Sequence, residues 1–179
     1  MKRNIPYRIA TAACAAVCWL MLLTGCAGGG RPVLWYQDAF TSAALTEGGR
    51  TWTLAPSPDG FTVRLDAPPP AAGVTFTVTD SGAFASAGGV TIPVTDAMLT
   101  GARRLTALFT LREEELFELS ASHGEGESAA ARYRTAAGEI TAVLGADGTP
   151  LYFDDPSGRV TVERLEFPPD ETNGNRGES

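Results

Sequence analysis

The feature that most constrains the fold of this chain is a period-2 alternation of apolar and polar residues, which recurs between glycine-containing turns from Gly49 onward. In residues 61–66 (FTVRLD), for example, every second residue is apolar. This pattern is typical of strands that bury one face, and threonine suits the exposed face. The alternation, together with the positions of turns, predicts strands over 51–54, 61–66, 74–79, 90–94, 129–135, 139–144, 151–154 and 159–167.

Short turns such as Pro58-Asp59-Gly60 and Pro156-Ser157-Gly158 separate these segments. Because short turns join neighbouring strands as hairpins, the expected sheet is an antiparallel meander of about nine or ten strands. Pro93 cannot donate a hydrogen bond to a neighbouring strand, so its strand is expected at a sheet edge or near its own end. The phase of alternation changes between Val162 and Leu165, which indicates a bulge in the last strand.

One segment near the middle of the chain has helical periodicity instead. Met98, Ala102, Leu105 and Phe109 recur at helical spacing after Thr95, a suitable N-cap residue.

Two further segments are less regular. Residues 113–119 are expected to add a further turn or two of helix, which gives a helical insertion of about 25 residues over 95–119. Residues 34–45 fit neither the strand period nor the helix period, so this segment is interpreted either as an early strand or as a helix.

The fold class predicted from these elements is α+β. It is a curled antiparallel sheet, or half-barrel, with the helical insertion covering its concave face. The apolar side chains of that face have two interpretations: they form an ordinary core, or some of them line an apolar cavity between sheet and helix. The candidate ligand-binding residues are Trp52, Phe61, Phe76, Val78, Ile92, Met98, Leu105 and Phe109.

The N-terminus has the layout of a secretory signal. Lys2, Arg3 and Arg8 precede an apolar run over residues 9–23. As a helix this run would be about 22 Å long, shorter than the roughly 30 Å hydrocarbon layer of a bilayer, so a permanent membrane span is the weaker alternative.

Leu23-Thr24-Gly25-Cys26 follows the apolar run and resembles the bacterial lipobox, in which the cysteine sulfur is lipidated and becomes the first mature residue. The resemblance implies a signal peptide over 1–25, then a lipidated Cys26 and a flexible tether over 26–32. A folded domain is expected over 33–168, and residues 169–179 are predicted to be a disordered tail.

Charge and cysteine content exclude several classes of partner. Residues 26–179 hold 11 Arg, no Lys and 21 acidic residues, a net charge of −10. A domain this acidic is not expected to bind nucleic acid or anionic lipid head groups by charge, so membrane contact would come from the anchor or from apolar surface. All three cysteines lie at or before Cys26, so the domain has no internal disulfide.

The sequence contains little catalytic or metal-binding chemistry. His123 is the only histidine, beside Ser122 in a glycine-rich stretch, and residues in one loop rarely form a preorganised catalytic pair. The acidic residues of 113–118 are interpreted as a solvated face, and Asp147, Asp154 and Asp155 as turn residues rather than calcium ligands. The chain is therefore predicted to be no enzyme and to hold no metal or cofactor. An envelope hydrolase is the low-probability alternative.

The chain resembles the lipoprotein-carrier (LolA/LolB-like) superfamily and its relatives among regulatory and spore-envelope lipoproteins. The features that carry the resemblance are the N-terminal signal, the strand pattern, the proline-rich link at 67–70 and the closing strand VTVERLEF. The resemblance implies a half-closed antiparallel barrel lidded by helices, and it rests on layout rather than on a diagnostic motif.

The predicted function is that of a membrane-anchored extracytoplasmic lipoprotein that binds an apolar ligand, such as a lipid or acyl chain, or an envelope partner. The alternative is a protein-binding scaffold, or a signalling or assembly component of the cell or spore envelope, without a ligand cavity. The expected location is the outer face of the cell membrane. In a Gram-negative host it is the outer membrane, because Ala27 stands where inner-membrane retention uses aspartate.

Overall fold

A computed structural model describes residues 32–69, 71–79, 81–95 and 99–169. The predicted signal peptide, Cys26, Met98 and residues 170–179 of the predicted tail therefore lie outside the described residues. The chain divides into two compact units, 1–32 and 33–179. All residues of the described hydrophobic core belong to the second unit, so this unit is expected to fold without the first.

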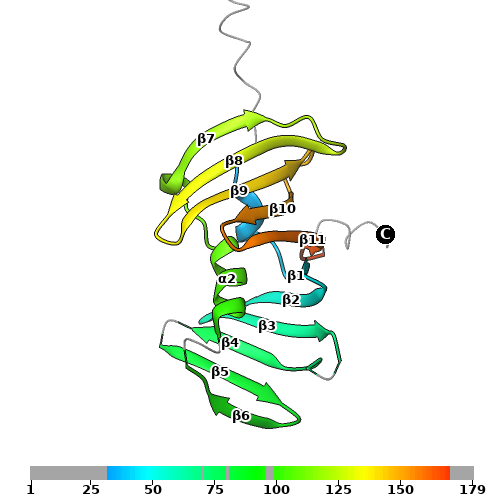
Figure 1. Cartoon of the computed structure of the whole chain (residues 1–179), viewed down its shortest axis with the longest axis vertical. Coiled ribbons are helices and arrows are strands. Elements are labelled where there is room, and N and C mark those ends of the chain that lie inside the picture. The colour runs from blue at the N-terminus through cyan, green and yellow to red at the C-terminus, as the bar shows by residue number, and fades with distance from the viewer. Residues whose placement is uncertain (1–31, 70, 80, 96–98, 170–179) are drawn as a thin grey trace, which may run out of the picture. The chain divides into compact units, whose positions relative to one another are not determined.

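The described elements of the second unit are mostly strands (Figure 1). In chain order they are η1 (Trp35–Asp38), β1 (Ser42–Glu47), β2 (Arg50–Ser57), β3 (Gly60–Ala67), β4 (Thr75–Thr79), β5 (Gly82–Ala87), β6 (Val90–Pro93), α2 (Thr100–Leu108), η3 (Glu113–Glu115), β7 (Leu116–Ala121), β8 (Glu127–Thr135), β9 (Gly138–Gly145), β10 (Pro150–Asp155) and β11 (Gly158–Glu166).

The described strands form one antiparallel sheet of eleven strands that does not close, in the order β6-β5-β4-β3-β2-β1-β11-β10-β9-β8-β7. It consists of two meanders, β1–β6 and β7–β11, joined where β1 pairs with β11. The chain passes from one edge, β6, to the other edge, β7, through α2, which lies across the middle of the sheet (Figure 1). The predicted antiparallel, helix-bearing sheet is thus confirmed in its coarse form, with more strands than predicted.

Two local predictions are confirmed by the register. Pro93 is the last residue of β6, which is an edge strand. In the pairing of β1 with β11, Ala44 lies opposite Arg164 and Leu45 lies opposite Val162, so Glu163 is the extra residue of a bulge. This bulge returns Leu165 to the phase needed to pack against the core.

The predicted helical insertion over 95–119 is wrong in its extent. Helix α2 has nine residues, begins after Leu99 rather than at Thr95, and has no side-chain N-cap bond. Residues 113–115 form only the 3₁₀ turn η3, and the segment from Leu116 is strand β7. The segment from Leu116 forms a strand because it pairs with β8, and the hydrogen bonds and packing of that pairing outweigh a weak helical propensity. Among the described residues no helix is long and apolar enough to cross a bilayer.

The core lies on the face of the sheet that carries η1 and α2, which we call the inner face. The aromatic ring of Phe109, at the C-terminal end of α2, contacts three other rings. The ring centroids lie 6.2 Å from Tyr36, 5.2 Å from Phe40 and 5.4 Å from Phe153. Burial raises the pKa of the Tyr36 phenol, which is fully enclosed in this cluster. The space beneath this end of α2 is therefore filled by the protein's own side chains.

We expect Phe109→Ala to lower the free energy of unfolding by about 3–5 kcal/mol, because the substitution removes a buried ring and leaves a cavity. Urea unfolding followed by circular dichroism measures the change. Phe117→Ala is the matched control: this ring is 43% exposed on edge strand β7, and its removal is expected to cost about 1 kcal/mol or less. Equal losses for the two variants would contradict the packing described for α2.

Candidate functional site

A pocket of about 430 Å³ lies between α2 and two hairpin turns, the β8–β9 turn and the β10–β11 turn. We call it the α2 pocket. Its lining residues are Thr100, Arg103, Arg104, Ala107, Leu108, Ala137, Ile140, Asp155, Pro156 and Ser157.

Local sequence explains how these residues meet. Thr100, Arg103, Arg104 and Ala107 are spaced by three and four residues, so they share one face of α2, whereas Leu105 points into the core. The opposite wall is formed by the two turns, which touch. A β-carbon at Gly138 would lie only 3.0 Å from Cγ of Pro156, so this close approach requires glycine.

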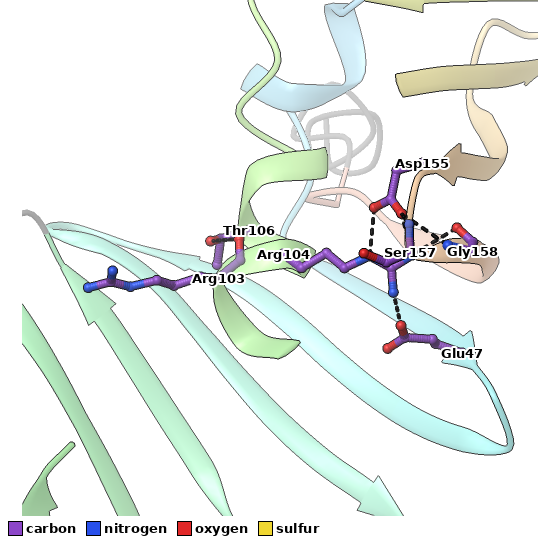
Figure 2. A network of polar contacts seen from close by, with 7 residues as sticks. All are labelled: Glu47, Arg103, Arg104, Thr106, Asp155, Ser157 and Gly158. Carbon is purple, nitrogen blue, oxygen red and sulfur yellow. Dashed lines mark hydrogen bonds and ion pairs between the residues drawn. The ribbon is translucent and has the colours of Figure 1, made fainter. Parts of the chain in front are cut away.

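A cluster of polar contacts around Arg104 closes one side of the α2 pocket (Figure 2). Its guanidinium donates from Nε to Oδ2 of Asp155 at 2.6 Å and from Nη2 to Oδ1 at 2.9 Å. Nη2 also donates to the carbonyl oxygen of Gly158 at 2.8 Å, and Nη1 forms an ion pair with Glu47. Bidentate pairing of this kind fixes both distance and orientation. The cluster therefore fastens α2 to the β1–β2 and β10–β11 turns.

The cluster is largely shielded from solvent. The side chains of Arg104 and Asp155 are only 13% and 7% exposed. Asp155 also accepts hydrogen bonds from the backbone N–H groups of Ser157 at 2.7 Å and Gly158 at 3.2 Å. The guanidinium of Arg103 points away from this cluster (Figure 2). The Arg104 and Asp155 groups in this wall are thus engaged with other parts of the protein, and the surface left for a ligand is mainly that of Ala107, Ala137 and Pro156, because Leu108 and Ile140 are almost fully buried.

The residues predicted from the sequence to line a cavity lie elsewhere. Trp52, Leu105 and Phe109 are buried members of the core. Phe61, Phe76 and Val78 are partly buried and pack against it, and Phe61 pairs directly with Val78 across β3 and β4. Ile92 is 48% exposed on β6, and Met98 is outside the described residues. None of the described candidates lines the α2 pocket.

Sequence reasoning missed the pocket residues because their signals are weak. Thr100, Arg104 and Ala107 have helical spacing, but the apolar stripe on the other face of the same helix is the stronger signal in the sequence. Pro156-Ser157-Gly158 was interpreted only as a turn. Nothing in the local sequence shows that this turn meets α2, since the two are more than forty residues apart.

A second polar cluster lies around Glu127 at the start of β8. Its carboxylate accepts hydrogen bonds from the hydroxyl groups of Ser122 and Tyr152, the latter at 3.0 Å, and from the backbone N–H of Gly124 at 3.2 Å. These bonds lower the pKa of Glu127. The guanidinium of Arg159 stacks on the Tyr152 ring at 3.8 Å. Ser122, which the sequence places beside His123, is thus a hydrogen-bond donor to Glu127, and Glu127 links the β7–β8 turn to Tyr152 of β10.

No set of three or more His, Cys, Asp or Glu residues within the described part of the chain is placed to hold a metal ion. Asp147 accepts hydrogen bonds from the backbone N–H and the hydroxyl of Thr149 at 3.0 and 2.7 Å, and Asp154 pairs with Arg159 at 2.7 Å. These carboxylates therefore serve turns and strand pairs.

Comparison of the chain with protein-family models, with curated proteins and with solved structures gives no match.

We expect Arg104→Met to lower the free energy of unfolding by about 2–3 kcal/mol, because Asp155 would remain buried without its cation. Chemical denaturation monitored by circular dichroism tests this. Arg164→Met serves as the control, since Arg164 is 71% exposed in its pair with Glu166, and we expect little or no change. A loss no larger than that of the control would mean that the cluster does not fasten α2.

Proposed function

We propose that this chain is a lipid-anchored, extracytoplasmic binding protein without enzymatic activity, and that its α2 pocket takes an apolar group such as part of an acyl chain. The observation that carries the proposal is the pocket itself, about 430 Å³ with largely apolar walls beside a polar wall occupied by Arg104 and Asp155. Small-molecule pockets have volumes of roughly 300–1,000 Å³, so this one has room for a single chain or ring rather than a whole multi-chain lipid.

The chemistry of the pocket supports binding over catalysis. Asp155 is held by Arg104 and by two backbone N–H groups, so its lone pairs are directed at protein donors rather than at the pocket. A general base needs an accessible carboxylate within hydrogen-bond reach of a substrate proton. An envelope hydrolase is correspondingly the weaker alternative.

The location in the proposal rests on the N-terminal sequence. Lipidation of Cys26 would hold the domain at the outer face of the membrane, or at the outer membrane in a Gram-negative host, because two or more acyl chains give stable anchoring. The open antiparallel sheet with a helix across it shares its coarse features with the half-closed, helix-lidded barrel that the resemblance to the lipoprotein-carrier superfamily implies, and membership of that superfamily is part of the proposal.

A second candidate function is a protein-binding scaffold, or a signalling or assembly component of the cell or spore envelope. One observation favours it: Leu105, Phe109 and Tyr36 fill the space beneath α2, where the sequence had suggested a cavity. Cross-linking in cells distinguishes the two candidates, because a scaffold gives one recurring protein partner.

We expect the mature protein to begin at Cys26 with covalent lipid on its sulfur. Intact-mass spectrometry of the membrane fraction measures this, and metabolic labelling with a palmitate analogue provides a second readout. Cys26→Ser should abolish the label and release the protein from the membrane. An unlabelled wild-type protein would rule out the anchor.

We expect Ala107→Trp to abolish binding of a fluorescent fatty acid, because the indole would fill the α2 pocket. Ala107 is exposed on α2, so the fold should be kept. Ala121→Trp is the matched control, since Ala121 is also exposed but lies at the end of β7, outside the lining. Titration of both variants with the probe gives the answer. Equal affinity in the wild type and in Ala107→Trp would contradict binding in this pocket.

A further inference from the structure

The strands β4, β5 and β6, which we call the β6 end of the sheet, differ from the rest of the domain in charge. Residues 67–95 contain one charged residue, Asp80, which lies between β4 and β5 and outside the described residues. The strands of the other meander carry ion pairs on their exposed face, such as Arg132 with Glu118 and Arg159 with Asp154. A domain with a strongly negative sequence thus has one end with a single charged residue.

The β6 end also exposes apolar side chains on both of its faces. Val90 and Ile92 are 65% and 48% exposed and lie opposite Ala87 and Ala85 of β5. Phe84, 44% exposed, pairs with Pro93 and therefore lies on the other face. The inner-face side chains continue into the partly buried Phe76 and Val78 of β4, so apolar surface runs from the core to the sheet edge.

Pairing of β6 with a second copy explains this surface poorly. The strand has only four residues and ends in Pro93, which lacks a backbone N–H, and short proline-containing edges are a common way to prevent edge-to-edge association. A protein docked on the inner face would also leave Phe84 in water. A medium that surrounds the edge on both sides covers all three exposed side chains.

We infer that the β6 end is a membrane-contact surface that inserts Phe84, Val90 and Ile92 into the interfacial zone of a lipid bilayer with neutral head groups. Insertion is shallow, because the free backbone groups along the edge of β6 need water or head groups as hydrogen-bond partners. Negative charge elsewhere in the domain repels anionic lipid, so the β6 end, with its single charged residue, is the part that approaches a bilayer at least electrostatic cost.

The contact itself does not involve the α2 pocket.

The test is flotation of residues 27–179, which lack the anchor but contain the whole described core, with phosphatidylcholine vesicles. Ile92→Glu is compared with Leu119→Glu, a matched control because Leu119 is 55% exposed on the opposite edge strand β7. We expect the wild type and Leu119→Glu to float and Ile92→Glu to bind at least about tenfold more weakly. Phosphatidylglycerol in the vesicles should weaken wild-type binding at low salt. Circular dichroism verifies folding, and Val90→Glu replaces Ile92→Glu if that variant does not fold.

Wild-type protein that stays unbound, or an equal effect of the two glutamate substitutions, would overturn the inference. A concentration-dependent dimer in analytical ultracentrifugation that Ile92→Glu disrupts, without vesicle binding, would assign the surface to self-association instead. The Ala107→Trp variant should still float. The experiments therefore distinguish a failure of ligand binding in the α2 pocket from a failure of the membrane contact.

Discussion

The pairing of β1 with β11 is the contact on which the rest of this structure depends. Ala43, Ala44 and Leu45 of β1 pair with residues of β11 that lie about 120 positions later in the chain. Each of the two meanders forms from local hairpins, but without this one non-local ladder they would be two small sheets with four edges. Loop closure over such a distance costs entropy that the ladder and the core beneath it must offset. The central position of both strands is what makes the core continuous.

Helix α2 follows from that topology. Because the first meander ends at one edge of the sheet and the second begins at the other, the connection must cross a face, and an amphipathic helix crosses while burying its apolar stripe. Leu105 and Phe109 fill the space beneath the helix, and the Arg104 cluster fixes its polar side to two turns. The α2 pocket is the space left beside the helix, where the turns and the helix meet without interpenetrating.

Much of the strand architecture could be predicted from sequence, because a strand that buries only one face alternates apolar and polar residues. The strand over 61–66 and the bulge before Leu165 were found in this way, whereas the edge position of the Pro93 strand followed from the missing N–H of proline. Strand β7 was mistaken for helix, because the short run Leu116–Leu119 directly follows an acidic stretch. The strand that pairs with this run is β8, and the local sequence does not show that pairing. The candidate site was missed for a related reason: its two walls come from segments that have no local signal of contact.

The sequence by itself determined the antiparallel character of the sheet, the placement of its turns, the acidity of the domain and the lipobox-like N-terminus. These properties follow from periodicity, turn chemistry and charge, which are local or additive. Only the tertiary structure decided which strands became the edges, that the aromatic candidates are divided between core and surface, and that a pocket lies beside α2 rather than beneath it. Those outcomes depend on contacts between distant segments, whose free energies no local pattern encodes.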